Sequence, residues 1–122
     1  MRIAVASKGS ELDSAIDSRF ARANCFIVTD SETGVTCVID NNENRLAEGV
    51  AGFQAAIDVE ETGAKAVVTG NIGPNAFVTL DSRGIKVYAG VTGTVADALA
   101  KLQESKLHLA KTPTVAAHWG LS

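Results

Sequence analysis

Short apolar runs that end in glycine-bearing turns constrain the fold of this 122-residue chain more than any other feature. Residues 66–69 form a continuous apolar run, which is typical of a strand buried on both faces. Residues 85–89 read as the next strand, and each of the two runs leads through a glycine-bearing turn into a segment with helical spacing. Strands that alternate with helices predict parallel strands joined by right-handed crossovers.

The N-terminal part of the chain predicts three more strands. Residues 2–6 read as a short buried strand. Residues 25–30 and 35–40 are strand-like, and the Gly-containing turn at 31–34 between them indicates an antiparallel hairpin. Together with the later strands, these elements predict an α/β domain with one mixed five-stranded sheet and flanking helices.

The first long helix is predicted between two polar, glycine-containing segments. An apolar stripe runs through Val50, Phe53, Ala56 and Ile57, and Gly63 stands where such a helix would stop. The preceding residues 41–48 are polar and rich in asparagine, and they predict a loop.

Two further helices follow the last two strands. Pro74 suits the first position of a helix, because its missing N–H costs nothing there, and Gly84 would end that helix. Its inward residues are predicted to be Ala76, Phe77 and Leu80. Thr94 and Asp97 resemble a capping box, and this helix would bury Val95, Leu99 and Leu102.

Composition limits what such a chain can do. A length of 122 residues corresponds to one ordinary domain, and the 46% share of hydrophobic residues is enough to form its core. We assign residues 1–105 to this domain and residues 106–122, where the helical pattern fades, to a C-terminal tail. The net charge of −3 is too small to favour nucleic acid or an acidic membrane surface as a partner. The sequence has no run of eighteen apolar residues and no signal-peptide core at its start, so we expect a cytoplasmic protein.

Residues that often carry catalysis or metal binding are few. Cys25 and Cys37 fit no zinc spacing and lie in apolar runs, which predicts two buried or half-buried reduced thiols. His108 and His118 are predicted to be surface residues of the helix end and tail. The sequence offers no convincing catalytic constellation.

Three strand ends could instead form an anion site. Ligands of open α/β sheets lie beyond the carboxyl ends of the parallel strands. Here these ends lead into residues 7–9, 70–75 and 90–94, and the last two precede predicted helix N-termini, whose free N–H groups favour anions. The alternative is that these glycines only form tight turns and allow close packing.

The long polar segment 7–23 adds basic side chains to the same end of the sheet. Arg19 and Arg22 flank Phe20, which we expect to plug the core and so to anchor the two guanidinium groups. Lys8 follows the first strand directly. The acidic residues of this segment, Glu11, Asp13 and Asp17, are expected to be solvated or to cap turns.

Several segments together resemble the dinitrogenase iron–molybdenum cofactor biosynthesis family over residues 1–105. The most specific is Gly70-Asn71-Ile72-Gly73-Pro74-Asn75-Ala76-Phe77. The others are residues 1–7, 18–22, 52–56 and 84–88. The resemblance implies a ribonuclease H-like α/β fold. It also implies a protein that binds, carries or assembles sulfide clusters containing molybdenum or iron, and within the family it favours a molybdenum–copper sulfide cluster held without a covalent bond to protein.

The chain departs from the family pattern where metal ligands would stand. A His-Phe-Gly-Arg stretch is replaced by Arg19-Phe20-Ala21-Arg22, and a frequent cysteine is replaced by Ala23. A histidine-bearing stretch before the long helix is replaced by residues 44–49. These departures favour outer-sphere capture of a preformed anionic cluster by charge-assisted hydrogen bonds over direct coordination by protein.

The predicted cluster site therefore combines basic side chains, turn backbone and two apolar residues, with no metal-coordinating residue. Its members are Lys8, Arg19, Arg22, Phe53, Asn71, Ile72, Gly73, Asn75, Thr92, Gly93 and Thr94. Three alternatives stay open. They are a carrier or assembly protein for an iron–molybdenum cofactor precursor, a metal-dependent hydrolase or phosphotransferase using Asp30 and Asp40, and a scaffold subunit that contacts a protein partner through the tail and Trp119.

Overall fold

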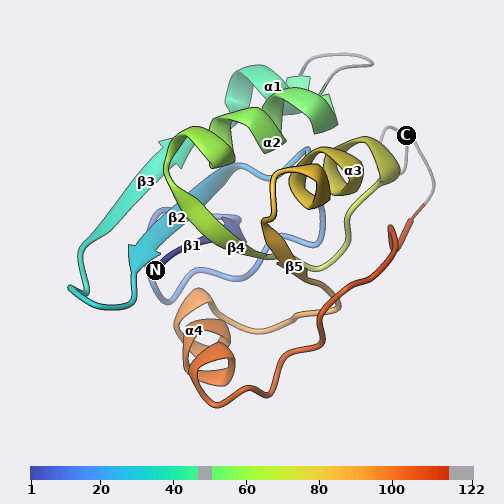
Figure 1. Ribbon diagram of the computed structural model, residues 1–122. Coiled ribbons are helices and arrows are strands. Elements are labelled where there is room, and N and C mark those ends of the chain that lie inside the picture. Colours follow the sequence, from blue (N-terminus) through green and yellow to red (C-terminus); the bar gives the residue numbers. More distant parts are fainter. Residues whose placement is uncertain (47–50, 116–122) are drawn as a thin grey trace.

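The computed structural model describes residues 1–46 and 51–115, and it shows nine helices and strands (Figure 1). The strands are β1 (Arg2–Ser7), β2 (Cys25–Asp30), β3 (Thr36–Asp40), β4 (Ala64–Val68) and β5 (Lys86–Tyr88). The helices are α1 (Asn42–Leu46), α2 (Ala51–Glu61), α3 (Pro74–Ser82) and α4 (Val95–Gln103). No helix of the described ranges is long and apolar enough to cross a membrane.

The strands form one mixed five-stranded sheet in the order β3-β2-β1-β4-β5. β1 pairs antiparallel with β2, and β2 pairs antiparallel with β3. β1 and β4 are parallel, as are β4 and β5. The predicted α/β class, the hairpin and the parallel section are confirmed. The carboxyl ends of β1, β4 and β5 therefore meet at one edge of the sheet.

Helices cover the two faces of the sheet unequally. Figure 1 shows α1, α2 and α3 on one side and α4 on the other. The core is divided accordingly. One cluster contains Phe26, Val67 and Leu80 on the α2–α3 side, and another contains Val5 and Val68 among others on the α4 side. Because β1 is buried on both faces, its residues contribute to both clusters.

The helical predictions for α3 and α4 are confirmed. Pro74 begins α3, and Ala76, Phe77 and Leu80 face the core. The N-cap of α4 is a capping box, in which the Thr94 side chain accepts from the Asp97 N–H and the Asp97 carboxylate accepts from the Thr94 N–H. Val95 is buried, and Leu99 and Leu102 pack partly buried against the same cluster.

The predicted inner face of α2 is confirmed at Ala56 and is wrong at Phe53. The helix buries the small residues Ala51, Ala55 and Ala56 together with Val59. Phe53 is 44% exposed, Ile57 is half-buried, and Val50 lies outside the described residues. Alanines allow α2 to approach the sheet and α3 closely, and a Cβ at Gly52 would lie only 3.2 Å from the Ala76 backbone nitrogen. Close backbone approach, not side-chain size, therefore selects the buried face.

Two other expectations need correction. Part of the predicted loop at 41–48 forms α1, which asparagine side chains hold in place: Asn41 and Asn44 are buried and hydrogen-bonded to each other. Cys37 is exposed, because it lies on the edge strand β3, most of whose side chains face solvent. Cys25 on β2 is buried, as predicted.

Candidate functional site

The segment between β1 and β2 crosses the carboxyl edge of the sheet from one core cluster to the other. Ile16 is buried in the cluster on the α4 side. Phe20 is buried on the opposite side, where its ring centroid lies 5.0 Å from that of Phe26. This confirms that Phe20 plugs the core. Residues 17–19 are therefore fixed across the ends of the parallel strands by one apolar anchor at each side.

The three loops at this edge are joined through their backbones. The Gly70 N–H donates to the Asp17 carbonyl at 3.3 Å, and the Gly90 N–H donates to the Gly70 carbonyl at 2.7 Å. The Ile16 N–H donates to the Gly93 carbonyl at 2.9 Å. The loops after β1, β4 and β5 thus form one connected structure.

A cleft of about 510 Å³ lies between these three loops. It is lined by Asp13, Ala15, Ile16, Ser18, Gly70, Asn71, Gly90, Val91, Thr92, Gly93 and Thr94. Four of the predicted site residues belong to this lining: Asn71, Thr92, Gly93 and Thr94. The other lining residues were not among the predicted site residues. They all lie in the glycine-bearing turns 70–75 and 90–94 or in the polar segment 7–23, and this position is the feature of the sequence that could have indicated them.

The donors available to a ligand in the cleft are mostly main-chain groups. In the part of the chain that the structure describes, the N–H groups of Thr92 and Gly93 have no protein acceptor. Gly93 has a φ of +96°, a conformation that only glycine adopts readily. Ser18 and Thr92, which also line the cleft, each carry a hydroxyl. These groups can donate hydrogen bonds to an anion or another acceptor.

The N-terminus of α4 offers less than predicted. The Val95 N–H donates to the Ser14 carbonyl and the Ala96 N–H donates to the Leu12 carbonyl. The capping box occupies the next N–H and that of Thr94. The N–H groups in the first turn of α4 are therefore already hydrogen-bonded within the protein. The main-chain donors left for a ligand are those of the turn before this helix.

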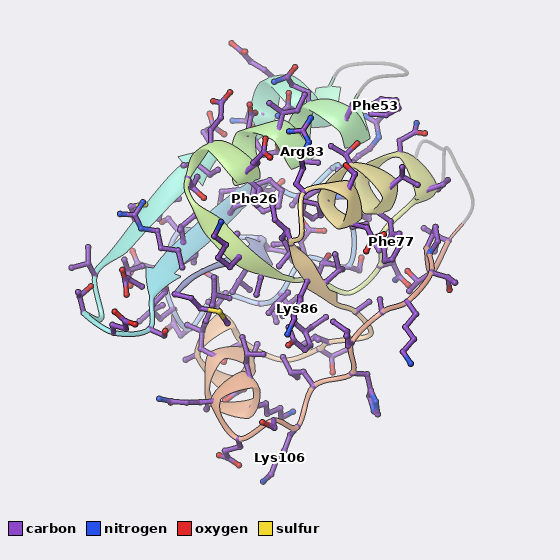
Figure 2. The ribbon with its side chains drawn as sticks, in the orientation of Figure 1. Phe26, Phe53, Phe77, Arg83, Lys86 and Lys106 are labelled. Carbon is purple, nitrogen blue, oxygen red and sulfur yellow. The ribbon has the colours of Figure 1, made fainter. Side chains whose placement is uncertain are left out.

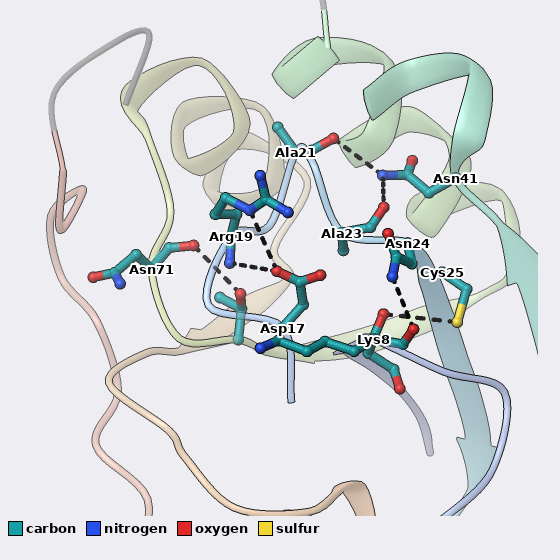
Figure 3. A network of polar contacts seen from close by, with 11 residues as sticks. Lys8, Asp17, Arg19, Ala21, Ala23, Asn24, Cys25, Asn41 and Asn71 are labelled. Carbon is teal, nitrogen blue, oxygen red and sulfur yellow. Dashed lines mark hydrogen bonds and ion pairs between the residues drawn. The ribbon is translucent and has the colours of Figure 1, made fainter. Parts of the chain in front are cut away.

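The predicted basic residues lie outside the lining. Arg19 is bound to the buried carboxylate of Asp17, with 3.6 Å between Nε and Oδ1 and 3.0 Å between its backbone nitrogen and the same oxygen. Figure 3 shows the Arg19 guanidinium and the Asn71 side chain pointing in different directions. Lys8 is exposed, and Arg22 is half-buried. Asp17 thus caps a turn as predicted, but it is not solvated.

The remaining predicted members are placed elsewhere. Ile72 is buried in the core on the α2–α3 side, so its side chain does not face the cleft. Phe53 is exposed on α2 (Figure 2) and does not line the cleft. Gly73 caps α3 through its carbonyl, to which Phe77 donates, and Asn75 is half-buried in the first turn.

Within residues 1–46 and 51–115, no cysteine or histidine lines the cleft. The Cys25 thiol donates towards the Gly9 carbonyl at 3.2 Å, and burial raises its pKa above the ordinary value. His108 is exposed, as predicted, while His118 and Trp119 lie outside the described residues. Among the described residues, no group of three or more His, Cys, Asp or Glu side chains could hold a metal ion.

Comparison with known proteins identifies the family. The model of the family described as dinitrogenase iron–molybdenum cofactor matches residues 1–105. The chain belongs to this family. Membership supports a cofactor-binding or carrier role related to that cofactor. It also covers all three loops that form the cleft.

Solved structures of relatives have the same fold. The apo form of the orange protein from Desulfovibrio gigas is 35% identical, with a TM-score of 0.91 over 93% of this chain and 96% of that one. A Thermotoga protein assigned to NifB is 34% identical, with a TM-score of 0.81 over 93% and 97%. In sequence alone, an uncharacterised protein of Methanocaldococcus jannaschii is 26% identical over 95 residues, which are 75% of this chain and 80% of that one.

Proposed function

We propose that this protein binds and carries an anionic molybdenum-containing sulfide cluster, of the molybdenum–copper type, in the cleft between the loops after β1, β4 and β5. The observation that carries the proposal is that Thr92 and Gly93 line the cleft while their N–H groups have no protein acceptor among the described residues. The similarity to the apo orange protein and the family membership support a cluster as the cargo.

The cleft suits a sulfide ligand better than a free metal ion. Terminal sulfides are acceptors, and the two turn N–H groups and the Ser18 hydroxyl can donate to them. Ile16 and Val91 add apolar contact surface to the same lining. The described lining contains a single carboxylate, Asp13, and no thiol or imidazole. It therefore has too few side-chain ligands to coordinate a metal ion directly. The cluster would be held intact and without a covalent bond.

Positive charge would act from around the cleft. Lys8, Arg19 and Arg22 all belong to the segment that crosses the sheet edge. Charges within about 10 Å of an anion still contribute at moderate salt, even without direct contact. Arg19 and Asp17 form an ion pair whose net charge is zero. Arg19 would therefore contribute to cluster binding more through directional hydrogen bonds than through long-range electrostatic attraction. We assign these residues to attraction and retention, and no catalytic step to the protein.

A second cargo is favoured by the family description. An iron–molybdenum cofactor precursor is also a sulfide cluster, and its surface would present the same acceptors to the cleft. The cleft geometry does not distinguish the two, because both would be recognised by main-chain donors. Metal analysis of the loaded protein decides between them.

The test is reconstitution of the apo-protein with tetrathiomolybdate and copper, followed by desalting. We expect a coloured, protein-bound species with molybdenum and copper retained. Thr92→Glu places a negative charge in the cleft and should abolish retention. Thr36→Glu is the matched control, because Thr36 is exposed on β3 and does not line the cleft. If only an iron–molybdenum precursor is retained, the cargo is the second one; if neither is retained, the proposal fails.

A further inference from the structure

The turn that follows β4 is fastened from two sides. On one side lies the segment that crosses the sheet edge: Gly70 donates to Asp17, and the Phe20 N–H donates to the Asn71 carbonyl at 3.1 Å. The Thr69 hydroxyl donates to the same carbonyl at 3.3 Å. The turn thereby continues the sheet past the end of β4, and it presents Asn71 and Gly70 to the cleft.

On its other side, the turn is bound by a residue 42 positions later in the chain. The Ile72 N–H donates to the Thr114 Oγ1 at 2.9 Å, and the Thr114 N–H donates to the Ile72 carbonyl at 2.9 Å. The Thr114 hydroxyl also reaches the Ile72 carbonyl at 3.4 Å, and the Val115 N–H donates to it at 3.3 Å. All backbone hydrogen-bonding capacity of Ile72 is therefore directed to residues 114 and 115.

The segment that carries Thr114 is itself anchored to the sheet. Leu109 forms an antiparallel bridge with Tyr88 on the free edge of β5. The Ala110 N–H donates to the Val87 carbonyl at 2.7 Å, and the Ala89 N–H donates to the His108 carbonyl at 3.3 Å. Figure 1 shows this segment running from α4 past β5 towards α3. It connects the sheet edge to the turn.

We propose that residues 108–115 form a clasp for the cleft, with Thr114 as a positioning residue for the Gly70–Ile72 turn. The part of this proposal that concerns cargo rests on the proposed function. The clasp lies beyond residues 1–105, the part of the chain that the family model matches. Without Thr114 Oγ1, the Ile72 N–H loses its acceptor in a half-buried turn, and the wall of the cleft becomes free to move.

The experiment compares three variants as apo- and reconstituted proteins. Thr114→Val removes the hydroxyl at nearly constant volume, and Thr114→Ser restores it. Thr36→Val is the matched control, since Thr36 is exposed on β3, outside residues 108–115 and outside the cleft lining. Amide hydrogen exchange of the apo-protein should show the Ile72 N–H exchanging about tenfold faster in Thr114→Val, with the β1 and β4 amides unchanged. Retention of tetrathiomolybdate and copper should fall about fivefold.

The outcomes separate the clasp from the cargo. Rescue of both readouts by Thr114→Ser, with Thr36→Val like the parent, supports the clasp. Unchanged exchange at Ile72 and unchanged retention in Thr114→Val would overturn it. If the parent protein retains no cluster, the proposed function fails, while the exchange rate of Ile72 and the chemical shifts of the Asn71, Thr92 and Gly93 amides still decide whether Thr114 shapes the cleft.

Discussion

Gly70 and Ser18 lie in direct backbone contact: a Cβ at position 70 would come within 2.7 Å of the Ser18 Cα and 3.1 Å of its carbonyl oxygen. This contact joins the turn after β4 to the segment that crosses the sheet edge, and both residues line the cleft. Gly70 does not have a positive φ, so its backbone conformation does not require glycine. Glycine is required here because any side chain would collide with the Ser18 backbone. The width of the cleft therefore depends on the missing side chain.

Gly70→Ala should both destabilise the protein and loosen the cleft. The added methyl group meets backbone atoms, which cannot move aside as a flexible side chain can, so we expect a loss of about 1–3 kcal/mol in the free energy of unfolding. Urea unfolding measures this loss. Cluster retention by the same variant should fall, because Ser18 and its loop must shift.

Gly84→Ala separates backbone strain from the steric effect. Gly84 has a φ of +71° and open space around its hypothetical Cβ. Its replacement should cost about 1–2 kcal/mol through conformation alone and should leave cluster retention intact. Equal retention by the two variants would show that the Gly70–Ser18 contact does not shape the binding site.

Asp13→Asn should strengthen retention of an anionic cargo. Asp13 is the single charged side chain in the described lining of the cleft, and its carboxylate opposes an anion there. Removing one exposed like charge should improve affinity about two- to fivefold at low salt, and the gain should shrink as salt is added. Equilibrium titration with tetrathiomolybdate at several salt concentrations measures this effect.

The control for Asp13→Asn is Asp81→Asn, which makes the same charge change at an exposed position near the end of α3. It should leave affinity unchanged. Weaker binding after Asp13→Asn would instead indicate that the carboxylate contacts a cation, and it would argue against an anionic ligand in this cleft.

The sequence predicts the sheet and two helices well because their signals are local. The capping box at Thr94 and Asp97, the proline that begins α3 and the apolar strands each depend on neighbours in sequence. The inner face of α2 could not be predicted in the same way. It depends on how closely Gly52 and the alanines let α2 approach α3, which is a tertiary property. The ribonuclease H-like classification stays a prediction.

The site is predicted only as far as its turns. Residues 92–94 and Asn71 are found from the rule that ligands lie beyond parallel strand ends. The partners that change their chemistry come from distant segments: Leu12 and Ser14 occupy the N–H groups of α4, and Asp17 engages Arg19. A motif taken alone does not reveal that another segment of the chain already binds its donors. The prediction therefore overestimates how many N–H groups of α4, and how much of the Arg19 guanidinium, a ligand can use.

Asn41→Ala should be strongly destabilising, because this side chain connects three parts of the chain. Its amide donates to the carbonyls of Ala21 and Ala23 at 3.0 and 2.9 Å (Figure 3). Its oxygen accepts from the Asn44 amide at 3.0 Å. Loss of these bonds leaves polar groups without partners in a buried setting, so we expect about 2–4 kcal/mol less stability. Urea unfolding measures it.

The control for Asn41 is Asn24→Ala. Asn24 is exposed and donates one hydrogen bond, to the Lys8 carbonyl at 2.9 Å. Its removal should cost less than about 1 kcal/mol. A similar loss in both variants would mean that burial does not amplify the Asn41 bonds.

Cys25 should make the protein less stable in alkaline solution. Burial raises the pKa of the Cys25 thiol above its ordinary value of 9.0. Below pH 9 the thiol is protonated in both the folded and the unfolded chain, so it causes no loss. As the pH rises above 9, the unfolded chain releases the proton first, and stability falls until the pH passes the folded pKa.

Urea unfolding between pH 7.5 and 10.5 tests this mechanism. Cys25→Ala should lower stability at pH 7.5, because it loses packing, but it should flatten the alkaline decline. Cys37→Ser is the matched control, since Cys37 is exposed on β3, and it should retain the decline of the parent.

Alkylation at neutral pH is a second test of the buried thiol. Cys37 should be modified well before Cys25, because the reactive thiolate at Cys25 is both buried and scarce. Equal alkylation rates at the two positions would contradict the buried, protonated thiol.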